Sequence, residues 1–446
     1  MNDHAPRDGS GEAAGDALRA EPRERLPLAD AARAVAGRIL DAGFETYFAG
    51  GCVRDRLLGA EPKDYDIATA ALPDEIRGIF PKARGVGEAF GVVLVRHGGH
   101  SFEVATFRED GPYHDGRRPS EVRYSTARED ALRRDFTANG LFENPRTGEV
   151  VDFVEGRADI AARLLRAIGD PHERIREDRL RMLRAPRFAA RLAFELEPRT
   201  AEAIRAHADE LASVSPERVG DELRRMLAHH ARGRAVALIE ALGLDGAVFG
   251  SRAPMASRRR VDALSAHGAA VPAGGWTTVL AAWWLDRAAG EGAEALPVAA
   301  TRAEMERGLR RRLVLSNHES DAFASALDCR EALLGPFRTG SIPFRARLIA
   351  RAGFDAALAL VAAEDPGLGA ALAAEADREL PARALPPPLV DGDTLVRAGY
   401  RPGPRFKRWL DLAMDAQLEG RVRSTEEALQ LVATAAAEGD GRGGGA

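Results

Sequence analysis

Hydrophobic and polar residues alternate in two different ways along the chain. Before residue 155 there are short runs with a period of two, such as residues 101–107, where Phe102 and Val104 share one side; this period predicts strands. Beyond residue 170 the apolar positions recur every three or four residues, which predicts amphipathic helices. We therefore expect an α+β protein, with a strand-containing α/β head followed by an extended all-helical region.

The pattern also places individual elements in the head and behind it. A helix is expected over residues 28–42, with Gly43 as its C-cap. The head is expected to hold a small mixed sheet of about five short strands with two or three helices. The expected strands cover residues 46–49, 65–68, 91–96, 101–107 and 150–154, and the expected helices behind the head cover residues 174–192, 198–211, 216–227 and 235–242.

Turn-rich and aperiodic segments predict the domain boundaries. Residues 1–26 lack periodicity and are expected to be a disordered tail. The head is expected over residues 27–165, a helical neck over 166–235 and a helical body over 236–385. A triple proline at 386–388 begins the C-terminal tail, 386–446.

Composition limits the classes of protein to consider. The 446 residues are 45% hydrophobic and 29% charged, as in a globular protein, and the net charge of −5 requires any nucleic-acid site to be a local basic patch. Two cysteines exclude a disulfide framework and a cysteine zinc site. No apolar run is long enough to span a membrane and no secretory h-region is present. A cytoplasmic protein without a membrane partner is expected.

A glycine pair lies where the first strand meets a helix. Gly50 and Gly51 occupy this turn, so backbone N–H groups and a helix N-terminus face whatever lies there. Arg54, one turn into the helix, adds positive charge. The turn is typical of a phosphate cradle, and tight packing without a ligand is the alternative.

Two carboxylates follow the turn. In an extended segment Asp64 and Asp66 point to the same face, with Cα atoms about 6–7 Å apart, and their repulsion favours a bound cation such as Mg²⁺. Glu103, on a neighbouring strand, is the candidate third carboxylate. The alternatives are a solvated acidic turn for the aspartates and a surface strand residue for Glu103.

Arginine is concentrated in two later segments. Residues 133–139 combine two cations, an acid and two neutral hydrogen-bonding residues, and residues 174–191 hold seven arginines against two acids, a local charge of +5. On the expected helix, Asp178, Arg181 and Arg184 recur every three residues on one side. An acceptor beside arginine donors can read a nucleobase edge; a salt-bridged solvated face is the alternative.

These motifs occur in a fixed order. Gly-Gly-x-Val-Arg-Asp is followed by Asp-x-Asp, Thr-Phe-Arg-x-Asp, Arg-Arg-Asp-Phe-Thr-x-Asn, Asp152-x-x-x-Gly156-x-x-Asp159-Ile and Glu-Asp-x-x-Arg-x-x-Arg. In this order the chain resembles the class II tRNA nucleotidyltransferase and bacterial poly(A) polymerase family, strongly over residues 27–230 and weakly over residues 395–431.

The resemblance implies roles for residues in the head and neck. Asp64 and Asp66 would hold catalytic Mg²⁺, and either Asp66 or Glu103 could assist catalysis. Nucleotide binding is assigned to Gly50, Gly51, Arg54, Arg133, Arg134, Asp135, Asn139, Asp178, Arg181, Arg184 and Arg187. Glu217-Arg218 and Glu222-Leu223 match a stabilising motif, residues 108–119 resemble a flexible loop that adjusts the base pocket, and the C-terminal tail would bind RNA.

The implied activity is template-independent nucleotidyl transfer to the 3′ end of tRNA, adding CCA or its terminal A from CTP and ATP. Poly(A) tailing of RNA is the alternative, and residues 81–95 lack the basic Arg-Arg-Phe run expected of that type. His229, His230 and His267 have no adjacent aspartate, so no second, phosphohydrolase site is expected. The sequence carries no signal for an oligomeric state.

Overall fold

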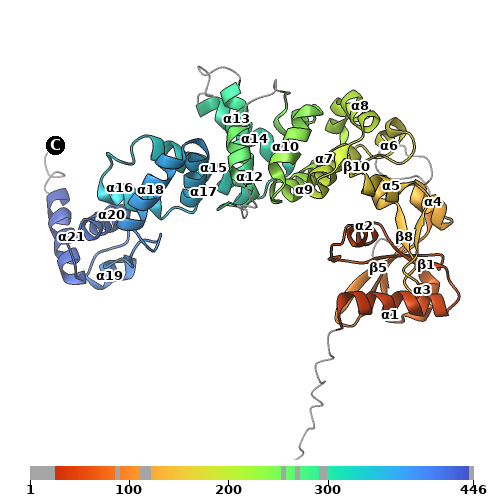
Figure 1. The fold of residues 1–446 in the computed structure, drawn as a ribbon. Helices are drawn as coiled ribbons and strands as arrows, with labels where there is room; N and C mark the ends of the chain where they lie inside the picture. Colours follow the sequence, from red (N-terminus) through yellow and green to blue (C-terminus); the bar gives the residue numbers. More distant parts are fainter. Residues whose placement is uncertain are drawn as a thin grey trace, which may run out of the picture. The chain divides into compact units, whose positions relative to one another are not determined.

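The computed structural model describes residues 26–85, 91–110, 122–252, 258–266, 272–290 and 299–440 (Figure 1). Contacts divide the chain into two compact units, the first formed by residues 1–114 and 119–162 and the second by residues 115–118 and 163–446. Three expectations fall on segments outside the described residues: the tail, apart from Leu26, most of the loop at 108–119, and His267.

The first unit contains the strands and helices of the head. They are α1 (Leu28–Asp41), β1 (Thr46–Ala49), α2 (Gly51–Leu57), β2 (Asp66–Thr69), α3 (Pro73–Ile79), β3 (Arg84–Gly85), β4 (Val92–His97), β5 (His100–Thr106), β6 (Arg108–Asp110), β7 (Val122–Tyr124), α4 (Ala127–Leu132), the 3₁₀ helix η2 (Thr137–Asn139), β8 (Leu141–Glu143), β9 (Val150–Asp152) and α5 (Gly156–Ala161).

Seven of these strands form one mixed sheet, in the order β3-β4-β5-β2-β1-β8-β9. The pair β2–β5 is parallel, with Ile67 beside Val104, and the other described pairs of this sheet are antiparallel. The prediction of a mixed sheet is confirmed. The parallel pair matters for the site because it aligns the beginning of β2 with the middle of β5.

The expected element counts in the head were too low. β3 and β8 were missed, as were β6 and β7, which pair as a separate hairpin. The described head also has five α-helices rather than two or three, because α2, α3, α4 and α5 are only six or seven residues long. Elements this short do not complete enough periods of the hydrophobic pattern to be recognised.

The two faces of the sheet are covered by different helices. α1 and α3 pack against one face, and α4 packs against the other (Figure 1). On the α4 face, Ala127 and Ala131 join Ala49, Ala68 and Phe142 in a buried cluster. Small side chains on both elements let the helix lie close to the strands. α4 is therefore held at a fixed position on the sheet.

The described residues of the second unit are helical apart from a short parallel strand pair. Its elements are β10 (Leu164–Leu165), α6 (Pro171–Glu177), α7 (Arg181–Leu192), β11 (Glu195–Leu196), α8 (Pro198–His207), the 3₁₀ helix η3 (Ala208–Ser213), α9 (Pro216–Leu227), α10 (Arg232–Ala241), α11 (Asp245–Phe249), α12 (Arg259–Ser265), α13 (Trp276–Gly290), α14 (Ala299–Leu313), α15 (Asn317–Leu334), α16 (Ile342–Ile349), α17 (Phe354–Glu364), α18 (Pro366–Glu379), α19 (Gly392–Arg397), α20 (Arg405–Leu418) and α21 (Thr425–Asp440).

The single helix expected over residues 174–192 is wrong. The chain forms α6, leaves helical geometry at Asp178 with φ −144° and ψ 102°, and starts again as α7 at Arg181. The Asp178 carboxylate accepts the backbone N–H of Leu180 at 3.1 Å. An aspartate that binds a nearby backbone N–H in this way competes with helix continuation, and the local hydrophobic period does not reveal it.

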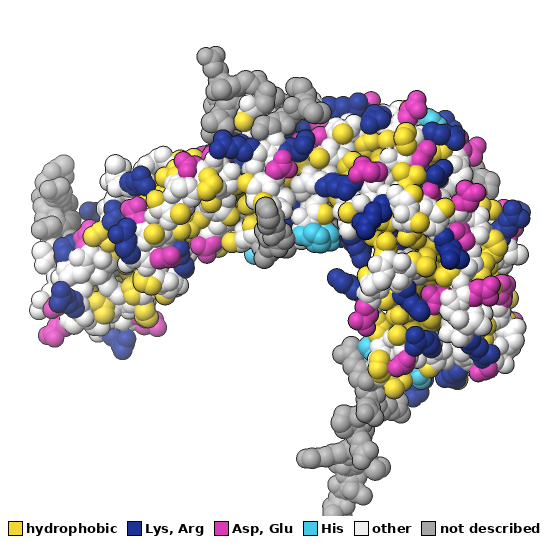
Figure 2. All heavy atoms as spheres, viewed as in Figure 1, with side chains coloured by type: hydrophobic (Ala, Val, Ile, Leu, Met, Phe, Trp, Pro, Cys, Tyr) yellow, Lys and Arg dark blue, Asp and Glu magenta, His cyan; other side chains and the backbone are white. Residues whose placement is uncertain are grey.

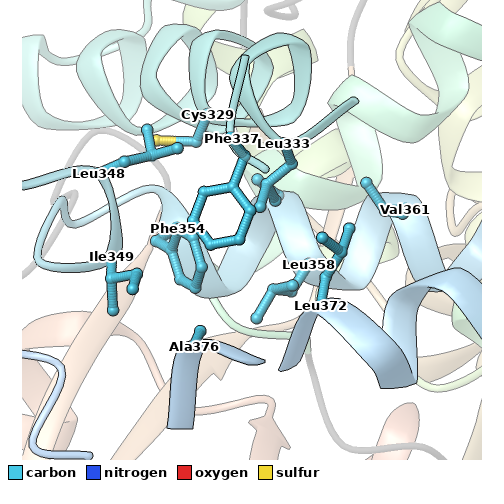
Figure 3. Close-up of a cluster of buried hydrophobic side chains, with 11 residues drawn as sticks. Cys329, Leu333, Phe337, Leu348, Ile349, Phe354, Leu358, Val361, Leu372 and Ala376 are labelled. Atoms are coloured by element: carbon cyan, nitrogen blue, oxygen red, sulfur yellow. The ribbon is translucent and has the colours of Figure 1, made fainter. Parts of the chain in front are cut away.

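The core of the second unit is built from successive helix pairs. One buried cluster joins α15, α16, α17 and α18, and Phe337 and Phe354 lie at its centre with ring centroids 6.3 Å apart (Figure 3). A separate cluster holds α19, α20 and α21 together around Leu395 and Val432. Among the described residues, no helix combines the length and apolar character needed to cross a membrane.

Candidate active site

The glycine turn joins β1 to α2 as the sequence predicts. Gly50 has φ +74°, a left-handed conformation that favours glycine, and its N–H donates to the Leu141 carbonyl of β8 at 3.0 Å. A Cβ on Gly50 would lie 2.8 Å from Nη1 of Arg134. The first N–H groups of α2 have no acceptor within the helix. The turn thus combines a close backbone approach with an arginine packed directly on it.

The predicted carboxylates meet at one place on the sheet. Tyr65 is buried against Phe48, whereas Asp64 and Asp66 on either side of it are exposed, so the two carboxylates share a face. Because β2 and β5 are parallel with Ile67 beside Val104, Glu103 lies next to Asp66. The register also pairs Asp66 with Ala49, next to the glycine turn.

The electrostatics of this cluster are repulsive. Partial burial and the charges of Asp64 and Glu103 raise the pKa of Asp66 to about 6, and Arg134 partly offsets them. Repulsion among carboxylates is the condition that a divalent cation relieves. Among the described residues, no three His, Cys, Asp or Glu side chains are already gathered in the geometry of a metal site. The donor set fits Mg²⁺, which commonly takes one or two carboxylates and completes its coordination with water and phosphate oxygens.

Arg133 and Arg134 are held by a residue that the sequence analysis missed. Asp130, buried in α4, accepts both guanidinium groups, one on each carboxylate oxygen. Burial alone would raise the pKa of Asp130, but Arg134 and Arg133 outweigh it and hold the pKa below its usual value. Its spacing of three and four residues before the arginines is the helical ion-pair signal that could have identified it.

Arg54 links the glycine turn to the later motif. Its side chain is 97% buried and donates to the carboxylate of the adjacent Asp55 and to Oδ1 of Asn139. Asn139 in turn donates to Oδ1 of Asp135 at 3.1 Å, and this oxygen also accepts the N–H of Phe136 at 2.8 Å. Asp135 and Asn139 therefore order this turn, and their assignment to nucleotide binding stays a prediction. A direct contact of Arg54 with a triphosphate stays a prediction.

The motif around Asp152 packs against the turn that contains Thr137 and Asn139. The Asp152 carboxylate accepts the N–H groups of Val154, Gly156 and Arg157 at the start of α5. A Cβ on Gly156 would lie 2.2 Å from the Thr137 carbonyl, so only glycine allows the approach. Asp159 accepts the Thr137 hydroxyl at 2.6 Å. These contacts clamp α5 onto η2 and hence support Asn139.

The proposed base-reading residues belong to the second unit and are arranged differently from the prediction. Because the helix breaks at Asp178, that residue does not share a helix face with Arg181 and Arg184. Asp178 accepts Arg218 of α9 at 2.8 Å, and Arg181 donates to Glu177 at 2.6 Å and to the Arg174 carbonyl at 2.8 Å. Asp178 and Arg181 still lie at the two ends of one turn, which the hydrogen bond from the Arg181 N–H to the Asp178 carbonyl closes. Their side chains are 20% and 11% exposed.

The motif on α9 supports this region through ion pairs. Arg218 binds Asp178, and Glu222, which is buried, pairs with Arg187 at 2.5 Å. Arg184 and Arg187 both lie over the Phe188 ring, 5.3 and 4.3 Å from its centroid. The predicted stabilising role of the motif thus has a physical basis: α9 supplies counter-charges to α7 and to the break before it.

Comparison with known proteins agrees with these motifs. Residues 46–166 match the family described as the Poly A polymerase head domain, and residues 193–249 match the probable RNA and SrmB-binding site of polymerase A. The CCA-adding enzyme of Pediococcus pentosaceus is 45% identical over 198 residues, 44% of this chain and 50% of that protein. The CCA-adding enzyme of Geobacillus thermodenitrificans is 46% identical over 204 residues, 46% of this chain and 50% of that protein.

The chain thus spans about half the length of the curated relatives it matches. Structural similarity extends further. The Bacillus stearothermophilus CCA-adding enzyme, solved with CTP, superposes with a TM-score of 0.69 at 27% identity, covering 93% of this chain and all of that one. The Thermotoga maritima enzyme, solved with tRNA, shares the fold at a TM-score of 0.63 and 19% identity, covering 91% and 94%. Residues 46–166 thus carry the Poly A polymerase head domain, and the fold of the chain is that of the CCA-adding enzymes.

Proposed function

We propose that the protein adds CCA, or its terminal A, to the 3′ end of tRNA from CTP and ATP in the cytoplasm. The observation that carries this proposal is the strand register that sets Asp66, two residues after Asp64, beside Glu103 and next to a glycine turn on which Arg134 packs. A divalent cation held by carboxylates, an arginine and the N–H groups of a backbone turn can together bind the phosphates of a nucleoside triphosphate. The 3′-hydroxyl oxygen then bonds to the α-phosphorus, and the bond to pyrophosphate breaks.

Asp64 and Asp66 are the residues proposed to hold Mg²⁺. When bound, the ion lowers the pKa of the attacking hydroxyl and offsets charge on the phosphates. Glu103 lies next to Asp66 and can orient the site or accept the hydroxyl proton. Arg134 and Arg133 are proposed to meet the phosphates or the ribose, while Gly50 and Gly51 keep the backbone close to them.

Base selection is assigned to Asp178 and Arg181, with Arg184 and Arg187 behind them. An aspartate acceptor next to an arginine fork can present a hydrogen-bonding pattern to a cytosine or adenine edge. The Asp178–Arg218 and Arg181–Glu177 pairs keep these two side chains in place, and Glu222 holds Arg187. The match of residues 193–249 to a probable RNA-binding site supports RNA as the acceptor.

The C-terminal segment around α19 and α20 is a proposed RNA contact. Residues 394–410 contain no acid, and their five cations are exposed: Arg397, Arg401, Arg405, Lys407 and Arg408. The half-buried rings of Tyr400 and Trp409 lie among them, with their centroids 5.1 Å apart. On the face drawn in Figure 2, cationic and acidic side chains are interspersed along the chain. Exposed cations beside aromatic rings suit a phosphate backbone and unpaired bases.

One experiment tests the activity. Transcripts of tRNA ending at the discriminator base, after C and after CC, together with an unstructured oligo(A), are incubated with CTP, ATP or both. A CCA-adding enzyme adds two C and one A and then stops, whereas a terminal-A enzyme extends only the transcript ending in CC. Asp64→Asn is the matched control: it should abolish incorporation while binding tRNA as the wild type does.

The same assay can contradict the proposal. Long ATP-dependent ladders on oligo(A), with no ordered product on tRNA, would assign the protein to poly(A) tailing. Incorporation by Asp64→Asn at more than a few per cent of the wild-type rate would remove the metal role of this residue. Steady binding of tRNA without incorporation by the wild type would point to a binding protein rather than an enzyme.

A further inference from the structure

Asp130 is a buried carboxylate of the head that binds two arginines. Its side chain is 2% exposed, and its two oxygens are divided between two arginines that are each 20% exposed. Oδ1 accepts Nε and Nη2 of Arg133 at 2.9 and 2.6 Å, and Oδ2 accepts Nε and Nη2 of Arg134 at 3.2 and 2.9 Å. One carboxylate therefore fixes two guanidinium groups and leaves a net positive charge.

The position of Asp130 is itself fixed by its helix. α4 is anchored by Ala127 and Ala131, which are buried against Ala49 and Ala68 of the sheet. Because Asp130 lies between these two alanines in the sequence, its backbone cannot move without disturbing that cluster. The arginines follow three and four residues later, directly after the helix ends at Leu132, with Arg133 as its C-cap. The sheet thus determines where both guanidinium groups are held.

Arg134 is bound by the Asp130 carboxylate and is also attracted by the Asp66 carboxylate. Its guanidinium lies 5.1 Å over the Phe142 ring and packs on Gly50, where phosphates are proposed to bind. It also acts electrostatically on Asp66, whose carboxylate is crowded by Asp64 and Glu103. Without a fixed counter-charge, attraction would draw Arg134 onto these carboxylates. It would then neutralise the proposed metal ligands and leave the glycine turn.

We propose that Asp130 is a positioning residue for nucleotidyl transfer: it holds Arg133 and Arg134 as a fixed pair and restrains Arg134 at the Gly50 turn. This inference rests on the proposed function. It assigns Asp130 no contact with the substrate and no proton transfer. The arginines it holds are expected to act on the phosphates, which CTP and ATP share, so the effect of Asp130 should not depend on the base.

The test uses Asp130→Asn in the full-length chain. Asparagine offers one acceptor oxygen and turns an N–H group toward the second arginine, so one of the two pairs is lost. Binding of CTP and of ATP is measured calorimetrically with Mg²⁺ and without RNA, so no reaction occurs. We expect both dissociation constants to rise about tenfold and by the same factor, with KM following and kcat changing less. The Mg²⁺ concentration for half-maximal binding should also rise.

Asp245→Asn is the matched control, because it changes the same residue type in another buried pair, Asp245 with Arg287. It should lower the melting temperature as Asp130→Asn does and leave both dissociation constants unchanged. Asp130→Glu keeps the charge and both acceptors but displaces them; it provides a folded variant if Asp130→Asn is unstable, and an intermediate effect is expected. Added to a variant with Arg133→Ala and Arg134→Ala, Asp130→Asn should change binding no further.

Several results would overturn the inference. They are unchanged nucleotide binding by Asp130→Asn and Asp130→Glu, a base-dependent change, or a further loss when both arginines are already absent. A loss no larger than that of Asp245→Asn would make Asp130 a stability residue. If the wild type binds neither CTP nor ATP, the proposed function fails as well. If the wild type binds both nucleotides and the Asp130 variants bind them equally well, this inference fails alone.

Discussion

Asp66 should oppose folding stability in the protein without metal, and Asp66→Asn tests this directly. The carboxyl has its pKa raised from 3.8 to about 6 by partial burial and by Asp64 and Glu103. Between these pH values the folded state binds more protons than the unfolded state, so the free energy of unfolding falls as pH rises. The deficit is complete above about pH 7. Asparagine carries no charge, so Asp66→Asn should remove this deficit in the free energy of unfolding.

The magnitude follows from the shift. Each pKa unit corresponds to about 1.4 kcal/mol, which gives about 3 kcal/mol as an upper limit for a shift from 3.8 to about 6. Because Asp66 is exposed on the sheet, solvent screening reduces this to about 1 kcal/mol. For a domain of this size, that corresponds to a rise of about 2–4 °C in the melting temperature of the head.

The assay is thermal unfolding with chelator present, from about pH 4 to about pH 8. The gain from Asp66→Asn should be small at the acidic end, grow up to about pH 6 and stay constant above about pH 7. Added Mg²⁺ should stabilise the wild type and not the variant, which should also have lost incorporation. Asp74→Asn, at a carboxylate 93% exposed in the same unit, is the control and should show no such profile. A lower melting temperature for Asp66→Asn at high pH, or a gain independent of pH, would refute the reasoning.

Three further predictions concern the turns and the base-reading region. Gly50→Ala should weaken CTP and ATP binding equally, at least about tenfold, because its Cβ would meet Arg134 Nη1 at 2.8 Å; normal binding in titration would show that the turn tolerates a side chain. Gly156→Ala should destabilise the head by about 1–3 kcal/mol in denaturant unfolding, through its contact at 2.2 Å with the Thr137 carbonyl. An unchanged unfolding midpoint would contradict that clamp. Arg181→Ala should raise KM for CTP and ATP and relax discrimination against UTP and GTP by about 1–3 kcal/mol; unchanged selectivity over four nucleotides would make this arginine structural.

The sequence by itself determined the features that depend on local spacing. A period of two or of 3.6 residues located β1, β4 and β5 and the helices α1, α8, α9 and α10, because such periods reflect which face is buried. The order of short motifs identified the glycine turn and the aspartate pair, since turn chemistry and i, i+2 geometry are local properties. Where elements were shorter than a full pattern, as in β3 and α5, the prediction failed.

The tertiary structure decided which of these local features meet. The parallel pairing of β2 with β5 brought Glu103 beside Asp66, and no local pattern encodes the register between strands so far apart in sequence. The break at Asp178 depends on a side-chain hydrogen bond and on Arg218 from another helix. Asp130 shows the division most clearly: its helical spacing to the arginines is local, but its burial, which makes the pairing strong, comes from the sheet on which α4 packs.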